Sequence, residues 1–137
     1  MSKYGVKLLW GGYRTYLDEV VGFSPWAYDR WKADIQPGTR MLLYETTKNK
    51  GAQAIVSEVE VVHGFAETAK LALVSPTEEH KHLVKIKVIH TVGAVTQIPR
   101  KQVQTILRRP HYPQQNDSWT PISEAEYRDF IKIWDGS

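Results

Sequence analysis

The 137-residue sequence contains no cysteine, which excludes a disulfide framework and any thiolate metal site. A chain without cysteine suits a reducing compartment, so we expect a cytoplasmic protein. Long apolar runs are absent as well: no stretch approaches the roughly 20 residues of a membrane-spanning helix, and the first residues show no signal-peptide pattern. Since 42% of the residues are hydrophobic, enough to fill one core, we expect a single soluble domain over residues 1–137 with no membrane partner.

The usual signatures of catalysis are missing too. The sequence has no glycine-rich phosphate loop, no Gly-x-Ser-x-Gly elbow and no cysteine nucleophile. Its paired carboxylates have simpler explanations, because Glu124 and Glu126 begin a helix and Glu58 and Glu60 lie on a strand. On that strand they face solvent or, alternatively, line a barrel mouth as general acid and base. We therefore expect a binding protein rather than an enzyme.

Metal ligands are scarce. His80, His82 and His90 fall on even positions of one stretch, so their side chains can share a face. No cysteine is available, however, no carboxylate stands at a supporting spacing, and a His-x-His pair on a strand is typical of a protein surface. The sequence thus predicts neither a metal site nor a cofactor.

Acidic residues are absent between Glu79 and Asp117, a window that contains seven lysines and arginines. The window therefore has a charge of +7. The rest of the chain has 11 of the 18 basic residues and all 15 acidic ones, so its charge is −4. This division of charge predicts one basic face.

The first third of the chain predicts a strand, a helix and a short helical turn. Residues 4–10 have the composition of a strand, and the apolar residues of 13–21 recur at helical spacing until Gly22, a natural stop. The dipeptide Ser24-Pro25 has the residue types preferred at the N-cap and first position of a helix. It predicts a helical turn over residues 24–31.

The middle of the chain predicts a sheet. Residues 36–39 (Gln-Pro-Gly-Thr) have the chemistry of a type II turn. Residues 40–46 and 52–62 are rich in Val, Ile, Leu and Tyr, which predicts two antiparallel strands. We expect the apolar piece 71–74 to pair with the alternating strand 82–90.

The last third predicts two helices joined by a loop. A helix over residues 99–107 ends before Pro110, and residues 110–121 have no regular pattern. Ser123 and Glu126 have the spacing of a capping box, which begins a last helix. Its expected buried stripe is Tyr127, Phe130, Ile131 and Trp134. This order of elements predicts a small α+β domain built on a curved or closed sheet.

Residues 35–44 (IQPGTRMLLY) have a Pro-Gly turn that leads into a strand ending in Tyr. Residues 54–61 (AIVSEVEV) follow as a second strand, which begins with Ala-Ile-Val. This combination resembles the EVE family of PUA-like domains, which are related to YTH domains, although Thr39 replaces the family's acid and Ser57 its glycine. The stretch 119–127 is similar to the family's entry into a terminal helix. The resemblance implies an α+β fold, a PUA-like twisted β-barrel with peripheral helices.

The resemblance also implies a function. Related domains accept a flipped, often modified, base between aromatic side chains, so we expect a module that binds RNA or modified DNA and needs no cofactor. The resemblance does not indicate which modification is bound. It leaves open the oligomeric state and whether the domain works beside a nuclease or motor partner.

Residues 23–31 carry four aromatic side chains interleaved with basic ones. A base stacked on an aromatic ring gains about 1–3 kcal/mol, so this composition suits a nucleic-acid site. We expect Phe23 and Trp31 to pack inward, as aromatic residues commonly do. The expected base-binding pocket consists of Trp10, Ser24, Trp26, Tyr28 and Trp119.

The basic residues near this segment and in the acid-free window are candidates for phosphate contacts, which give an affinity that falls with salt. The alternative is an ordinary solvated surface. The candidate residues are Arg30, Lys32, Lys85, Lys87, Arg100, Lys101, Arg108 and Arg109.

Two other functions stay open. PUA-like relatives of the ASCH type include hydrolases that act on modified nucleosides, but their Gly-x-Lys-x-x-Glu-x-Arg pattern does not occur in this chain. A module that uses its aromatic segment to bind a peptide is the other alternative.

Overall fold

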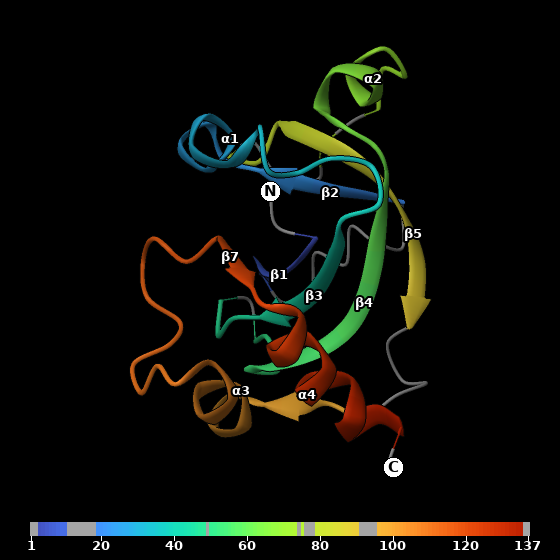
Figure 1. The fold of residues 1–137 in the computed structure, drawn as a ribbon. Helices are drawn as coiled ribbons and strands as arrows, with labels where there is room; N and C mark the ends of the chain where they lie inside the picture. Colours follow the sequence, from blue (N-terminus) through green and yellow to red (C-terminus); the bar gives the residue numbers. More distant parts are fainter. Residues whose placement is uncertain are drawn as a thin grey trace.

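The computed structural model describes residues 3–10, 19–48, 50–73, 75, 79–90 and 96–135. This part of the chain forms one curled, seven-stranded sheet with four helices around it (Figure 1). The strands are β1 (Tyr4–Leu9), β2 (Val20–Phe23), β3 (Arg40–Glu45), β4 (Ala54–His63), β5 (His82–His90), β6 (Ile98–Pro99) and β7 (Trp119–Ile122). The helices are α1 (Pro25–Trp31), α2 (Phe65–Ala69), α3 (Arg100–Leu107) and α4 (Glu124–Asp135). None of these helices combines the length and the apolar character needed to cross a bilayer.

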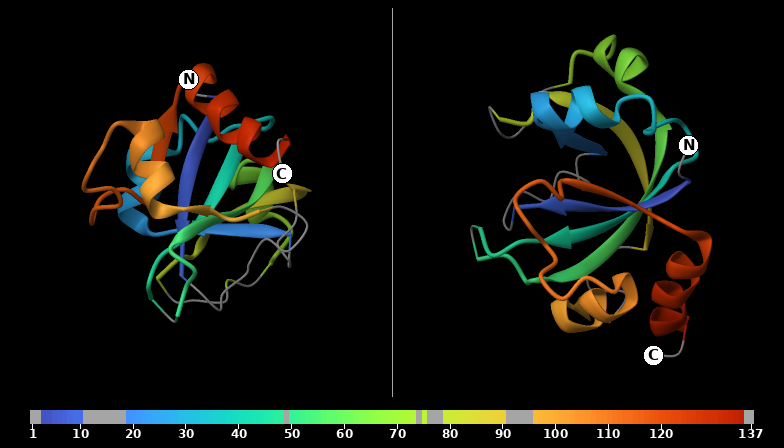
Figure 2. Two further views of the ribbon diagram at one scale, coloured as in Figure 1. Left: turned by 90° about the horizontal axis from the view of Figure 1, so that it is seen from below. Right: turned by 60° about the vertical axis from the view of Figure 1, so that its left-hand side comes forward.

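The sheet is mixed. Its strand order is β2-β5-β4-β3-β1-β7, with β6 paired to β4 outside this order. The β1–β3 pair is parallel, and the other pairs are antiparallel. Figure 2 shows how the long strands β4 and β5 bend, so that the sheet curls into a half-barrel.

Strand β3 is buried on both faces, which explains why it is a continuous apolar run rather than an alternating one. Met41 and Leu43 belong to a core cluster that also contains Ala27 of α1 and contacts Phe65 of α2. The intervening Leu42 and Tyr44 belong to a second cluster, which includes buried side chains of α3 and α4. Each pair of helices therefore covers its own face of the sheet.

Several local predictions are confirmed. The Ser24 hydroxyl accepts a hydrogen bond from the Ala27 amide at 3.3 Å and caps α1. The turn at residues 36–39 forms with an amide-to-carbonyl bond of 3.0 Å from Thr39 to Gln36, and Gly38 has the positive φ of +94° that this turn requires. The predicted hairpin of β3 and β4 is also present.

The capping box at the start of the last helix is confirmed as well. The Glu126 amide donates to the Ser123 hydroxyl at 3.1 Å, and the Ser123 amide donates to the Glu126 carboxylate at 2.8 Å. Phe130 and Trp134 are buried on the stripe that the spacing predicts.

The predicted helix over residues 13–21 is wrong at its end. Val20 and Val21 lie in β2, paired with Lys85 and Val84 of β5, and residues 11–18 lie outside the described part of the chain. Both valines are β-branched, and pairing with a distant strand outweighs the local helical spacing. Gly22 continues the strand, where a side chain would collide with the backbone carbonyl of His80.

Two further predictions are wrong because the strand partners are distant in sequence. Leu71 and Leu73 are exposed after α2, whereas β5 pairs with β2 and β4. The predicted loop of residues 110–121 ends in β7, which pairs with β1 at the edge of the sheet. Pro121 is tolerated in β7 because an edge strand does not need every backbone donor.

Candidate functional site

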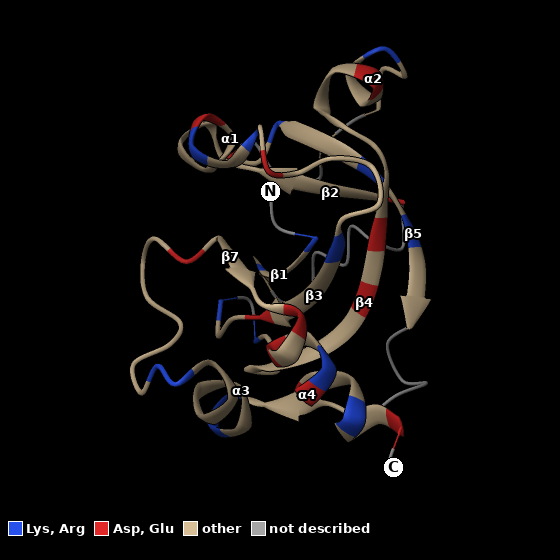
Figure 3. Ribbon diagram, in the orientation of Figure 1, with Lys and Arg blue, Asp and Glu red and all other residues tan. Residues whose placement is uncertain are grey.

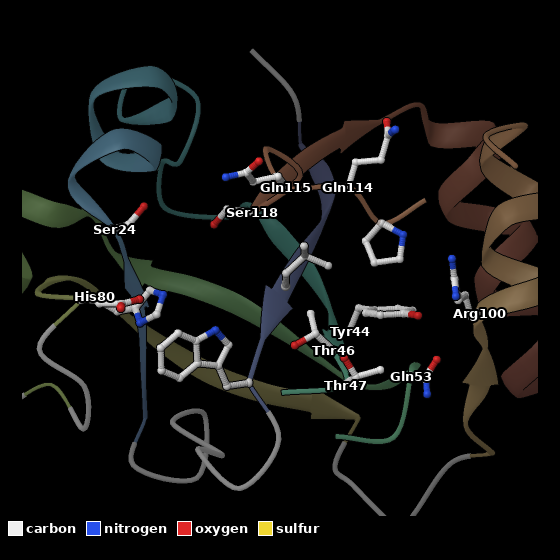
Figure 4. A pocket seen from close by; sticks show the side chains of 14 residues that line it. Ser24, Tyr44, Thr46, Thr47, Gln53, His80, Arg100, Gln114, Gln115 and Ser118 are labelled. Atoms are coloured by element: carbon white, nitrogen blue, oxygen red, sulfur yellow. The ribbon is translucent and has the colours of Figure 1, made fainter. Parts of the chain in front are cut away.

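An open cleft of about 480 Å³ lies where five elements of the fold meet. Trp10 follows β1, Ser24 caps α1, Tyr44 lies in β3, Arg100 begins α3 and Ser118 precedes β7. In Figure 4, Ser24 and His80 stand on one side of the cleft and Tyr44 and Arg100 on the other. This volume is in the usual range for small-molecule sites.

Uncharged hydrogen-bonding groups dominate the lining of the cleft. The side-chain amides come from Gln53, Gln114 and Gln115, and hydroxyls come from Thr46 and Thr47 (Figure 4). Each amide offers both a donor and an acceptor, which is the pattern needed to match the edge of a heterocyclic base.

Asp117 supports the loop that carries Gln114 and Gln115. Its carboxylate accepts two hydrogen bonds from the Arg109 guanidinium, at 2.8 and 2.9 Å, and one from the backbone N–H of Gln114 at 2.7 Å. A paired arginine and carboxylate in this geometry are well suited to fix a loop. Arg109, a candidate phosphate ligand, is therefore engaged within the protein.

Trp10 provides an aromatic wall of the cleft. Its ring meets the edge of His80 with centroids 5.0 Å apart and planes at 88°, and the Lys48 ammonium lies 3.6 Å from its ring centroid. Burial lowers the pKa of His80, and the nearby charge of Lys7 lowers it further. A neutral imidazole is thus favoured beside the tryptophan.

Beneath the cleft lies a buried lysine. The Lys7 side chain is only 1% exposed, and its amine donates to the Leu8 carbonyl at 2.9 Å and to the Ser118 hydroxyl at 3.2 Å. The ring of Phe23 lies 4.7 Å from the same nitrogen. Burial lowers the pKa of Lys7 from its usual 10.5 to about 7, so the amine is close to half protonated at neutral pH.

The hydroxyl of Tyr44 is buried at the edge of the cleft and finds no hydrogen-bond partner among the described residues. Figure 4 shows this side chain pointing toward Arg100. Burial raises the pKa of Tyr44, although the charge of Arg100 opposes the shift. Buried polar groups are rarely left unsatisfied in folded proteins, so this hydroxyl is unusual.

Of the five side chains predicted for the base pocket, Trp10 and Ser24 line the cleft. Trp119 does not, because its ring is buried at 1% exposure in the core beneath Gly5, and its indole N–H donates to Asp34 at 3.4 Å. The expectation that Trp119 forms a pocket wall is corrected, since this residue lies in β7 and not in a loop.

Trp26 and Tyr28 lie on α1 and are not among the residues that line the cleft. Trp26 is 50% exposed. Tyr28 stacks on His82 with ring centroids 3.9 Å apart and meets the edge of Phe65 of α2. Phe23 is fully buried, as expected.

The predicted basic face does not extend over β5. Lys85 pairs with Glu19 at 2.9 Å and Lys87 with Glu60 at 3.3 Å, because acidic residues from elsewhere in the chain lie beside β5. Figure 3 shows acidic residues on β4 beside basic residues on β5, and shows α3 in a different part of the molecule.

The remaining candidate phosphate ligands fall in two places. On α3, Arg100 lines the cleft and donates to the Tyr112 carbonyl at 3.1 Å, while Lys101 and Arg108 are exposed. At α1, Arg30 and Lys32 are exposed, and each lies about 5 Å from the ring of a neighbouring aromatic residue, at 5.1 and 5.2 Å respectively.

The strand carboxylate Glu58 neither faces solvent nor lines the cleft. It is fully buried, and its oxygens accept from His90 at 2.8 Å and from the Tyr127 hydroxyl of α4 at 2.5 Å, with Arg40 at 3.6 Å. Burial and the bond to Glu58 raise the pKa of Tyr127. This network joins α4 to the sheet and encloses Glu58, so the alternative that Glu58 lines a barrel mouth as an acid or base is corrected. Glu60 is paired with Arg40 and Lys87.

The three histidines of the middle region also have separate surroundings. His80 lies against Trp10, His82 against Tyr28 and His90 against Glu58. The described part of the chain holds no group of three or more histidines and carboxylates placed to bind a metal ion.

Sequence analysis missed Lys7, Tyr44 and the three glutamines of the cleft. The sequence does indicate the buried lysine, because Lys7 stands between apolar neighbours in a strand whose composition is typical of a buried one. The glutamines lie in loops and carry no periodic signal.

No known protein family and no curated protein sequence matches the chain, but solved structures match its fold. A hypothetical protein from Leishmania major has a TM-score of 0.67 at 14% identity, with 97% of this chain and 94% of that one covered. ASCH from Zymomonas mobilis has a TM-score of 0.58 at 16% identity, with 96% and 95% covered. The Pho92 YTH domain, solved in complex with m6A, has a TM-score of 0.66 at 8% identity, with 96% and 84% covered.

At these identities the likeness shows the fold alone. It confirms the PUA-like α+β architecture that the sequence predicts, with the sheet curled into a half-barrel and helices at its periphery. ASCH and YTH domains share this architecture, and the likeness does not single out the EVE family among them.

Proposed function

We propose that this chain is an RNA-binding module of the EVE type that takes a single modified base out of the strand and into the cleft. The observation that carries the proposal is the buried Tyr44 hydroxyl, which has no partner among the described residues and lies at the edge of an open, polar cleft. A base that enters the cleft supplies the hydrogen bond that this hydroxyl lacks.

The other groups of the cleft suit the same ligand. Trp10 offers an aromatic surface on which a base can stack, and the amides of Gln53, Gln114 and Gln115 can match donors and acceptors on its edge. A methyl group on the base adds apolar contact with an aromatic wall at little cost in hydrogen bonding.

A cation at the cleft can hold the RNA backbone. Arg100 lines the cleft, whereas Lys101 lines a different hollow together with Asp129 and Ile133 of α4. Arg100 therefore places a positive charge where a phosphate next to the extruded base would lie.

The likeness to the Pho92 YTH domain supports a modified base as the ligand, since that domain was solved with m6A and shares the fold over 96% of this chain. The absence of the ASCH-type Gly-x-Lys-x-x-Glu-x-Arg pattern supports binding rather than hydrolysis by the residues of those relatives.

The proposal is tested by measuring the binding of short RNA and DNA strands, each with and without a methylated base, by fluorescence anisotropy. We expect the modified RNA to bind most tightly, because the 2′-hydroxyl adds contacts that DNA lacks. Equal binding of all four strands, or no binding, would contradict the proposal.

Substitution locates the binding site. Trp10→Ala removes the stacking surface and should weaken binding of the modified RNA by about 10-fold or more, since a stacked base is worth about 1–3 kcal/mol. Trp26→Ala is the matched control, because it removes an exposed tryptophan that does not line the cleft. If Trp26→Ala weakens binding and Trp10→Ala does not, the ligand lies on α1 instead.

A further inference from the structure

Ser118 stands between the cleft and the buried lysine. Its side chain lines the cleft (Figure 4), and its hydroxyl oxygen lies 3.2 Å from the Lys7 nitrogen. The backbone fixes this arrangement, because Lys7 is paired with Trp119 across β1 and β7, and the Leu8 amide donates to the Ser118 carbonyl at 2.9 Å. A hydroxyl is thus held with one side toward a ligand and the other toward an amine.

We propose that Ser118 and Lys7 form a nucleophile and general base that hydrolyse a carboxylic ester in the cleft. The geometry meets the requirement for an activated serine, which is a base within hydrogen-bonding reach of its hydroxyl. The ester occupies the same cleft as the base proposed above, and its hydrolysis does not depend on base recognition.

The surroundings of Lys7 favour the neutral amine that such a base requires. Its hydrogen bonds go to the neutral oxygens of Leu8 and Ser118, and no carboxylate of the described residues forms a salt bridge with it. The titratable group that faces it from the cleft is His80, which also lies in the field of Glu79 and Lys48. Burial lowers the pKa of Lys7 to about 7, so a large fraction of the amine is neutral at physiological pH.

The reaction balances with water as the only co-reactant. The Ser118 oxygen attacks the ester carbonyl carbon while its proton passes to the Lys7 nitrogen, and the tetrahedral adduct expels the alcohol, which takes that proton. Water then attacks the acyl-serine and gives a proton to Lys7, the bond between the acyl carbon and the serine oxygen breaks, and the serine recovers its proton. The products are a carboxylic acid and an alcohol.

The lining of the cleft supplies the other groups that this chemistry uses. Gln115 lies beside Ser118 in Figure 4, and its side-chain amide is a donor for the oxygen of the adduct. The hydroxyls of Thr46 and Thr47 and the amide of Gln53 suit a hydroxylated leaving alcohol, such as a sugar. The substrate class is therefore an acyl ester of a polyhydroxylated alcohol.

The test uses the full chain and p-nitrophenyl acetate as the probe. We expect a burst of nitrophenol followed by steady turnover, one acetyl group on Ser118 by peptide mass spectrometry, and a burst rate that rises with pH through about 7, where Lys7 loses its proton. Ser118→Ala should abolish the acetylation at this position.

Lys7→Met should slow the burst by about 100-fold and remove its pH dependence, because general bases of this kind contribute at least that factor. Lys70→Met is the matched control, since Lys70 is an exposed lysine paired with Glu67 on α2. A wild-type protein without acetyl on Ser118, an acetyl group that does not turn over, or a burst unchanged by Lys7→Met in a folded protein would each overturn the proposal. Circular dichroism spectra that match the wild type establish that the variants are folded.

Discussion

Three charged side chains are buried among the described residues, Lys7, Glu45 and Glu58, and the surroundings of Glu58 and Lys7 differ most clearly. Glu58 in β4 is enclosed by Arg40, His90 and Tyr127, so both of its oxygens have donors. Lys7 in β1 has two neutral oxygens and an aromatic ring as neighbours. Glu58 therefore belongs to a network in which each of its oxygens has a donor. Lys7 is an amine for which burial disfavours the charged form.

The difference separates a structural role from a functional one. A buried carboxylate with complete partners holds α4 against the sheet and lies outside the cleft. A buried amine without an opposite charge costs stability, because desolvation disfavours its charged form. The buried amine beside the Ser118 hydroxyl is the basis of the proposed ester hydrolysis.

Removing the carboxylate should have the largest effect on this comparison. Glu58→Ala leaves Arg40, His90 and Tyr127 without their common acceptor, and breaking a buried ionic network of this kind costs about 3–5 kcal/mol. Urea unfolding should therefore show a strongly lowered free energy of unfolding. Glu60→Ala, at a more exposed position of the same strand, should cost less, and equal losses would mean that Glu58 has no special role.

Removing the amine of Lys7 should change the free energy of unfolding in the opposite direction. Lys7→Met should raise the free energy of unfolding at pH 7 by on the order of 3 kcal/mol, because a pKa lowered by several units on folding is a penalty of that size. Between about pH 7 and 10.5 the unfolded chain binds a proton that the folded chain does not, so the wild type gains stability as pH rises and the advantage of Lys7→Met shrinks.

Measuring urea unfolding of both proteins from pH 6 to pH 10 checks this sign. Lys70→Met serves as the control, since it replaces an exposed lysine by the same residue. A constant difference across the pH range, or a destabilised Lys7→Met, would show that the amine is not disfavoured in the fold.

The smallest expected effect is on the salt dependence of RNA binding, and it distinguishes a cation at the cleft from one already paired with a carboxylate. Arg100→Gln removes a charge at the cleft and should reduce the salt dependence of RNA binding by about one phosphate contact. Lys87→Gln removes a charge that is already paired with Glu60 on β5 and should leave the salt dependence nearly unchanged. Plots of log affinity against log salt for the two variants make this comparison, and parallel slopes would contradict it.

The sequence predicts what depends on near neighbours. The cap at Ser24, the turn at residues 36–39 and the capping box at Ser123 each involve contacts within four residues, and all are present. Strands β2 and β7 were not predicted, because their pairing partners lie far along the chain and local patterns do not identify them.

The same reasoning explains the candidate site. The acid-free window of the sequence is not acid-free in space, since Glu19, Glu60 and Asp117 pair with three of its cations. Trp10 and Ser24 were predicted from the resemblance and from residue type, but the position of Tyr44 beside the cleft depends on how the sheet curls. Residue type alone does not distinguish a wall such as Trp10 from a core residue such as Trp119.

The central claim, that a base enters the cleft, is tested most directly by nuclear magnetic resonance of the labelled protein during titration with a methylated RNA strand. We predict that the indole signal of Trp10 and the side-chain amide signals of Gln53, Gln114 and Gln115 shift together and saturate at one equivalent, while the Trp26 indole changes less. Shifts confined to α1, or a saturated complex in which the cleft signals do not move, would contradict the claim.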